Sequence, residues 1–360
     1  MTTDQTLQAR IRTLRFEAEG IMSVELVPLS GAQWPAFTAG AHIDLHLPNG
    51  LTRSYSLLNS QSESNRYVLG ILADGKSRGG SRYVHDHFRC GHSITIGLPR
   101  NAFALDETTK DIVLIAGGIG ITPILSMYRR LLALNGATRH ADGTAGRDAD
   151  DIAASDAATA AASPKRVKLV YCARRRDQAA FVEELEALSR DIHCDISSDI
   201  SSDIHYHFDT EHDGKPFDLS AFMAQQSPDV DAYCCGPSVM LDAFEAACAS
   251  AGVTRVHVER FAADTTLTQA PRVGYQVQLA KSGLTLDVNP DTSLLDTVLA
   301  AGVDVDHSCM EGICGACETA VLSGCPDHRD SVLSKAEKAS NKVIMLCVSG
   351  AKQGPLVLDL

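Results

Sequence analysis

The sequence lacks the features that would place this protein in a membrane, outside the cell or on nucleic acid. No apolar run approaches the roughly 18 residues that a membrane-spanning helix needs. The N-terminal segment has no apolar core of the kind found in signal peptides. Lys and Arg number only 32 against 45 Asp and Glu, and the resulting net charge of −13 should repel nucleic acid. We therefore expect a cytoplasmic protein that binds neither membranes nor nucleic acid.

The chain is also unlike a disulfide-stabilised secreted protein, although it contains 11 cysteines. Its 360 residues are enough for about two or three domains, and its cysteine count is odd. The cysteines before residue 250 are scattered, which is typical of small buried apolar side chains. The others lie between Cys309 and Cys347, and three of them fall within nine residues. That grouping indicates a metal-binding loop.

Strand and turn patterns divide the chain into three domains. Residues 1–105 carry short strand-like segments between Gly and Pro turns, which predicts an antiparallel β-barrel or sandwich with strands at 23–29, 42–47, 66–72 and 93–98. Residues 106–263 alternate strands with helices, which predicts a doubly wound parallel α/β domain. Its strands are expected at 111–116, 167–171, 232–235 and 256–258, and its helices at 123–134, 178–189 and 238–251.

A polar linker at 264–271 leads to the third domain, residues 272–360. We expect strands there at 274–279, 284–288, 343–348 and 356–360, with a helix at 293–301. Two segments of the middle domain have unusual composition. Residues 136–164, rich in Ala and Asp, are expected to form a disordered insertion. The Asp-Ile-Ser-Ser repeat at 195–204 is interpreted as a duplicated loop or strand edge.

The cysteine-rich loop of the third domain carries the strongest chemical signal. Cys309, Cys314 and Cys317 follow the pattern C-x4-C-x2-C, and Cys347 lies further along the chain. This is the spacing of plant-type 2Fe-2S ferredoxins. A zinc site usually has paired C-x2-C units, and buried free cysteines rarely show this spacing. A Rieske centre needs two Cys and two His, but its half-patterns, Cys90-Gly91-His92 and Cys325-Pro326-Asp327-His328, fall in different predicted domains. His205 and His207 are expected on a solvated strand face.

The middle domain has two turns suited to a dinucleotide. Gly118, Gly120, Thr122 and Pro123 follow a buried strand and open a helix, where backbone N–H groups attract a pyrophosphate. Gly236 and Pro237 occupy the equivalent place after another strand. An ordinary strand-to-helix turn is the alternative for each. Arginines 174–176 are either ligands for the 2′-phosphate of NADPH or simply exposed.

The first domain has a phosphate-binding pattern of its own. Arg53-Ser54-Tyr55-Ser56 lies on a barrel strand, where Arg can grip a phosphate and Tyr can pack on a flavin. Gly79, Gly80 and Ser81 at a helix start can add N–H and hydroxyl donors. Taken alone, the Arg-x-Tyr-Ser pattern favours an ordinary alternating strand.

With these motifs in this order, the chain resembles the phthalate dioxygenase reductase family, which includes vanillate O-demethylase reductases and belongs to the ferredoxin–NADP reductase superfamily. The resemblance rests on RSYSL, RGGS, GGIGITP, YCCGP, the cysteine loop, the segment 327–330 and the ending LVLDL. It implies an N-terminal flavin-binding barrel, an NAD-binding α/β domain and a C-terminal β-grasp ferredoxin.

The resemblance also implies roles for single residues. FMN would be held by Arg53, Ser54, Tyr55, Ser56, Gly79, Gly80 and Ser81, and the nicotinamide nucleotide by Gly118, Gly120, Thr122, Pro123, Gly236 and Pro237. Cys235 would lie at the nicotinamide and Phe261 near the flavin, as the catalytic pair. Cys309, Cys314, Cys317 and Cys347 would bind the cluster. The family prefers NADH, with NADPH possible.

The implied function is the reductase of an oxygenase system. NADH gives two electrons together and the cluster takes one at a time, so a flavin is needed between them. The expected partner is a Rieske-type terminal oxygenase, and the reductase is expected to be a monomer. A stand-alone NAD(P)H-dependent oxidoreductase that reduces a small molecule is the alternative, and a zinc-bearing binding protein is a third interpretation. Turnover without a protein acceptor would favour the stand-alone oxidoreductase, and colourless purified protein would favour the zinc-bearing binding protein.

Overall fold

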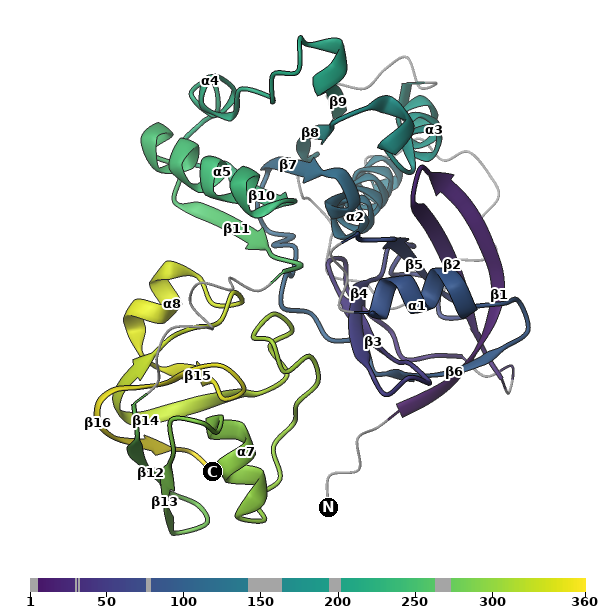
Figure 1. Ribbon diagram of the computed structural model, residues 1–360. Helices are drawn as coiled ribbons and strands as arrows, with labels where there is room; N and C mark the ends of the chain where they lie inside the picture. The colour runs from purple at the N-terminus through teal and green to yellow at the C-terminus, as the bar shows by residue number, and fades with distance from the viewer. Residues whose placement is uncertain are drawn as a thin grey trace.

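The computed structural model describes residues 6–29, 31, 33–75, 79–141, 164–193, 202–262 and 273–360. They form three sheets that follow one another along the chain and lie in three separate parts of the molecule (Figure 1). The multidomain fold predicted from the sequence is confirmed. Within the described part of the chain, no helix is both long and apolar enough to cross a membrane.

The first domain is an antiparallel barrel with strand order β4-β3-β6-β1-β2-β5. An isolated bridge between Leu57 and Leu69 joins the two ends of this order and closes the barrel. Its elements are β1 (Thr6–Ala18), β2 (Ile21–Pro28), β3 (His42–His46), β4 (Thr52–Ser56), β5 (Tyr67–Leu72), α1 (Gly80–His87) and β6 (Ser93–Gly97). Alternate side chains such as Ile11, Leu26 and Ile43 fill the interior.

The second domain is a parallel sheet with strand order β11-β10-β7-β8-β9. Its elements are β7 (Asp111–Gly117), α2 (Ile121–Ala141), β8 (Arg166–Ala173), α3 (Val182–His193), β9 (Ser202–Phe208), α4 (Leu219–Met223), β10 (Asp231–Cys235), α5 (Ser238–Ala251) and β11 (Arg255–Glu259). Leu114 of β7 packs in one core with α2, whereas Val113 packs in another with α5. Because both faces are covered, β7 is apolar after its first residue, Asp111, as the sequence predicted.

The third domain is a mixed sheet with strand order β13-β12-β16-β14-β15. It contains β12 (Tyr275–Leu279), β13 (Leu284–Val288), α7 (Leu294–Ala300), β14 (Glu318–Asp327), α8 (Lys335–Ser340), β15 (Val343–Met345) and β16 (Gly350–Leu358). Serine side chains cap the N-termini of these helices: Ser293 caps α7, and Ser334 forms a capping box with Glu337 on α8. These helices bracket the cysteine loop.

Several expected boundaries differ from the structure. Helix α2 continues to Ala141 rather than ending at 134, so it runs into the predicted insertion. The rest of that insertion, most of the Asp-Ile-Ser-Ser repeat, the linker and Arg78 lie outside the described residues. The domain limits at 105, 263 and 272 therefore stay predictions. His205 is exposed as expected, but His207 is buried. His212 covers the His207 ring by stacking on it, and His207 Nε2 donates to Lys215 O.

Candidate functional site

The four predicted cluster ligands come together in the third domain. All four side chains are buried, and three lie on the loop between α7 and β14. This loop turns sharply through left-handed backbone at Met310, Gly312 and Gly315. Gly312 is required for a second reason, because an added Cβ would lie 2.6 Å from Val348 Cγ2. The tight path aims backbone groups at sulfur, as Glu311 N–H donates to Cys309 Sγ at 3.3 Å.

The thiols form two pairs. A hydrogen bond with Cys314 is the main reason that the pKa of Cys309 falls to about 6, and Cys347 likewise lowers the pKa of Cys317. Among the described residues, no three of His, Cys, Asp and Glu are placed to share one metal ion. Two thiol pairs suit a 2Fe-2S cluster, in which each iron takes two ligands, better than a tetrahedral zinc ion. The donor set therefore fits the cluster.

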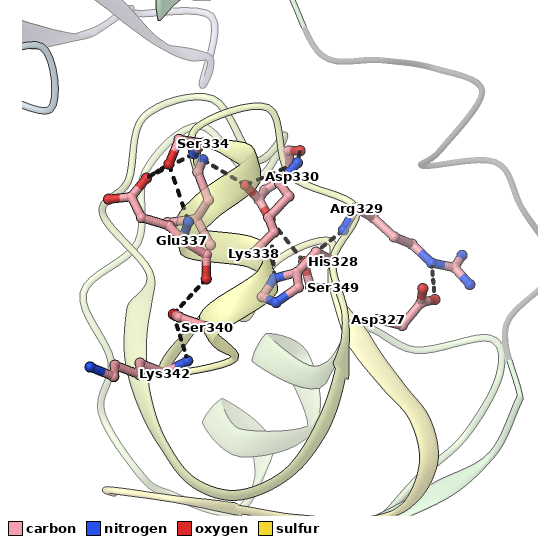
Figure 2. A network of polar contacts seen from close by, with 11 residues as sticks. Asp327, His328, Arg329, Asp330, Ser334, Glu337, Lys338, Ser340, Lys342 and Ser349 are labelled. Atoms are coloured by element: carbon pink, nitrogen blue, oxygen red, sulfur yellow. Dashed lines mark hydrogen bonds and ion pairs between the residues drawn. The ribbon is translucent and has the colours of Figure 1, made fainter. Parts of the chain in front are cut away.

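The buried carboxylate of Asp330 lies in a network of polar contacts (Figure 2) and packs against Gly312 of the cysteine loop. Asp330 Oδ2 accepts from Leu333 N–H at 2.8 Å, and Lys338 Nζ donates to Asp330 O at 2.6 Å. Burial raises the pKa of Asp330, but contacts with His328, Leu333 N–H and Lys338 outweigh it and lower the pKa. Because Ser331 N–H also donates to Gly312 O at 2.8 Å, this network fixes the inner side of the cysteine loop.

The predicted flavin site forms a cradle at the start of α1. Gly79 precedes this helix with φ of 97°, a conformation that favours glycine. A Cβ at Gly80 would lie 2.5 Å from Arg53 Cγ, so the missing side chain lets Arg53 cross the helix start. A guanidinium beside the N-terminus of a helix fits the phosphate of FMN. Burial raises the pKa of the neighbouring Tyr55 to about 12, so its ring stays neutral.

The three serines of the predicted flavin site have protein partners. Ser54 Oγ donates to Asp44 Oδ1 at 2.6 Å, and Ser81 Oγ accepts from Asp74 N–H at 3.4 Å. Ser56 contacts Glu259 of the second domain. These serines join the flavin strand to its surroundings, and their contact with the flavin itself stays a prediction.

A cavity of about 930 Å³ lies at the carboxyl ends of the parallel strands. Of the residues predicted to bind the nicotinamide nucleotide, Gly118 and Pro237 line it, together with Arg174, Asp209, Lys215 and Phe217. Gly120, Thr122, Pro123 and Gly236 do not line it. Thr122 is buried and packs against barrel strand β5, where a Cβ at Gly70 would lie 2.6 Å from its Cγ2. Thr122 therefore joins two domains.

The two nucleotide turns touch each other. A Cβ at Gly120 would lie 2.2 Å from Cys235 O, so only glycine allows the start of α2 to approach the end of β10. The arrangement places two helix starts at one edge of the sheet. This is the crevice in which parallel α/β folds bind dinucleotides.

Sequence reasoning missed one residue of this region, Glu259. Its side chain is partly buried, and burial raises its pKa to about 8, although contact with Ser56 opposes that shift. Cys235, which is fully buried, has Sγ 4.0 Å from Glu259 Oε2. Phe261, two residues further on, is 41% exposed. The acidic residue at the end of strand 256–258 was a usable signal, because a carboxylate in an apolar strand needs a partner or a proton.

The three consecutive arginines have different surroundings. Arg175 donates to Asp177 at 2.9 Å, and Arg176 donates to Glu211 at 3.0 Å with its guanidinium over the Phe208 ring. Only Arg174 lines the cavity, where Asp209 lies as well.

The cysteine loop lies against the flavin strand. Arg53 Nη1 is 4.0 Å from Glu311 Oε1, across the boundary between the first and third domains. A Cβ at Gly315 would lie 3.9 Å from Ala102 Cβ of the barrel. Lys335 of α8 pairs with Glu245 of α5 at 3.0 Å, so the third domain contacts both others (Figure 1). The predicted flavin and cluster sites are therefore neighbours.

Comparisons with known proteins agree with this arrangement. Residues 277–352 match the 2Fe-2S iron-sulfur cluster binding domain, and residues 114–246 match the oxidoreductase NAD-binding domain. Tetrachlorobenzoquinone reductase of Sphingobium chlorophenolicum is 41% identical over 355 residues, covering 99% of this chain and 98% of that protein. Phthalate dioxygenase reductase of Burkholderia cepacia is 36% identical over 363 residues, covering all of both chains.

Solved structures extend the comparison to the fold. A phthalate dioxygenase reductase covers 99% of this chain and 98% of its own, with 35% identity and a TM-score of 0.64. An intact type IV self-sufficient monooxygenase matches 99% of this chain with 31% identity and a TM-score of 0.78, but this chain spans only 41% of that protein. The chain belongs to the phthalate dioxygenase reductase family of NAD-dependent iron–sulfur oxidoreductases.

Proposed function

We propose that this protein is the reductase of an oxygenase system, which carries electrons from NADH through FMN to a 2Fe-2S cluster and on to a Rieske-type terminal oxygenase. The contact between the cysteine loop and the flavin strand, Arg53 to Glu311, is the observation that carries this proposal. When bound, FMN and the cluster would supply the conversion of a two-electron donor into single electrons. The chain's own residues bind, orient and shield these groups.

The cavity would admit NADH, the electron donor, and the two nucleotide turns would position it. Gly118 and Pro237 would face the pyrophosphate, with Cys235 and Phe261 toward the nicotinamide and flavin. The raised pKa of Glu259, about 8, favours its protonated form at neutral pH. A neutral carboxyl there would not oppose the transfer of negative charge from the nicotinamide to the flavin. Arg53 and the start of α1 would hold the FMN phosphate.

The cavity favours NADH over NADPH. Asp209 stands at the carboxyl end of edge strand β9, where an acidic residue can accept from the ribose 2′-hydroxyl and repel a 2′-phosphate. Arg175 and Arg176 already hold acidic partners. We therefore assign the preference to Asp209.

The partner and the setting are inferred from relatives. Phthalate dioxygenase reductase is named as the reductase of an oxygenase, which supports an oxygenase as electron acceptor here. We further propose that the reductase acts as a monomer in the cytoplasm. Gel filtration of the holoprotein, alone and with a Rieske-type oxygenase, tests both the monomer and the partner.

The main experiment is an anaerobic absorption spectrum of the purified protein before and after one equivalent of NADH. We expect flavin bands and a broad iron–sulfur envelope, both bleached by NADH. Colourless protein, or flavin bands alone after anaerobic cluster reconstitution, would overturn the assignment of Cys309, Cys314, Cys317 and Cys347.

A second candidate function rests on the relative named tetrachlorobenzoquinone reductase. In this alternative, the protein would pass electrons directly to a small quinone. Steady-state NADH oxidation with a benzoquinone alone, compared with a Rieske-type oxygenase plus its substrate, separates the two. Rapid quinone turnover with no stimulation by oxygenase would favour the second candidate.

A further inference from the structure

An ion pair with a buried carboxylate lies on the barrel beside the cysteine loop, and none of the roles above uses it. Asp44, on β3, is 2% exposed, and the 35% exposed Arg100 donates from Nη2 to its Oδ2 at 2.6 Å. Burying the carboxylate costs its solvation, so a pair of this kind rarely contributes much to stability. Its position suggests a role in the electron path instead.

The barrel holds this pair rigidly. Ser54 Oγ donates to Asp44 Oδ1 at 2.6 Å, which ties the carboxylate to the flavin strand. The backbone of Arg100 exchanges two hydrogen bonds with His42, at 2.8 and 3.0 Å. The backbone of Arg100 is therefore held by His42 beside β3, and its guanidinium is held by Asp44.

The pair also reaches the cysteine loop. Burial lowers the pKa of Arg100, but Asp44 and then the nearby Cys314 and Cys309 outweigh burial and raise it. Ala102, two residues along, packs on Gly315 of the loop. Arg100 Nε and His42 Nε2 are buried and have no hydrogen-bond partner among the described residues, whereas Ser308, which precedes the ligand Cys309, contacts the Asp44 carboxylate. The barrel thus presents a charged pair to the ligand loop, with Asp44 at Ser308 and Arg100 near Cys314.

We propose that Arg100, held by Asp44, is a positioning residue that raises the reduction potential of the cluster from the neighbouring domain. In the transfer concerned, one electron leaves the flavin and enters the cluster, which becomes more negative. A fixed positive charge beside the thiolates stabilises the reduced form, so it favours electron flow toward the cluster. Asp44 orients Arg100 and moderates its charge. This inference rests on the proposed function.

The test is a redox titration of the cluster in the loaded full-length protein, followed by its electron paramagnetic resonance signal. For Arg100→Gln we expect at least a tenfold loss in the equilibrium constant for cluster reduction, which is about 59 mV for one electron. Arg100→Lys keeps the charge and should stay within threefold of the native protein. Asp44→Asn should shift the potential the opposite way, upward, because a negative charge is removed.

Arg166→Gln is the matched control. Arg166 pairs with Asp111 at the first residue of β7, at the opposite edge of the sheet from the nucleotide turns. If Arg100→Gln and Arg166→Gln give equal potentials, the inference is wrong. Should Arg100→Gln fail to load its cluster, an unchanged potential in Asp44→Asn would overturn the inference. Absence of any cluster signal in the native protein would instead refute the proposed function.

Discussion

Glu259 lies where the parallel sheet meets the barrel, with its partly buried side chain beside Cys235 and Ser56. No cation is among the groups that shift its pKa, so burial keeps the side chain neutral. Asp209, at the far strand of the same sheet, contacts His207 at 3.6 Å and lines the cavity. Burial thus favours the neutral form of Glu259, whereas Asp209 lines the nucleotide cavity.

Glu259→Gln should change how stability depends on pH. The pKa of Glu259 rises from 4.5 to about 8 on folding, so its neutral form stabilises the fold below pH 4.5. That contribution is lost as the pH rises through 8. The native protein should therefore lose about 1–3 kcal/mol relative to the variant between pH 5 and pH 9. Thermal unfolding of both holoproteins across this range checks it, and parallel curves would contradict it.

Asp209→Ser should relax the choice of nucleotide. Removing the carboxylate removes repulsion of a 2′-phosphate, so kcat/KM for NADPH should rise about tenfold while that for NADH falls severalfold. Arg175→Ser is the control, because Arg175 pairs with Asp177 outside the cavity. Steady-state kinetics with both nucleotides measure the ratio. A ratio that moves equally in the two variants would refute the role of Asp209.

The elements that carry the nucleotide turns depend on close backbone approach. Helix α2 begins where Gly120 meets the last residue of β10, and β5 of the barrel packs on the same helix start. The lack of a side chain at Gly120 and at Gly70 therefore allows α2, β10 and β5 to approach one another closely. Helix α2 itself contains one glycine, Gly136, with open space around it.

Gly120→Ala should therefore destabilise the second domain. Its Cβ would meet Cys235 O at 2.2 Å, and a backbone carbonyl cannot move aside cheaply, so we expect a loss of about 2–4 kcal/mol. Gly136→Ala should instead stabilise by about 0.5–1 kcal/mol, because alanine suits a helix better. Denaturant unfolding of both variants measures this pair. Equal effects would mean that the turns do not meet as described.

Strand prediction failed where the pattern was mixed. Strand β1 was not predicted, because Arg10 lies between its inward-facing Ala9 and Ile11, and Arg12 and Arg15 follow. Strand β14 contains Gly324 and Pro326, which usually mark turns, and the structure accommodates them with shifts of register against β16. Each strand is held between two partners, β1 between β2 and β6 and β14 between β15 and β16, and this pairing overrides the local signal.

Across the whole molecule, the third domain bridges the other two through a few polar contacts. Arg53 and Glu311 are 21% and 14% exposed, whereas Lys335 in the contact with Glu245 is 85% exposed. Less exposed charges are screened less, so these two contacts should differ in strength.

Glu311→Gln should weaken the docking of the ferredoxin domain by about 1 kcal/mol, which is about fivefold in the docked population. Cluster reduction after rapid mixing with NADH should slow by that factor, while flavin reduction keeps its rate. Lys335→Gln should leave both rates unchanged, because its exposed pair contributes little. Stopped-flow absorbance resolves the two steps. Equal rates in Glu311→Gln and the native protein would show that this contact does not hold the domain.

The sequence by itself determined the domain order, the fold class and the four buried thiols, because spacing and periodicity are local properties of the chain. It also indicated the two turns and the arginine of the flavin strand. Only the tertiary structure decided that Thr122 packs on the barrel, that Glu259 lies beside Cys235, and that Arg100 reaches the cysteine loop. These contacts join residues far apart in sequence, and burial and charge act through space.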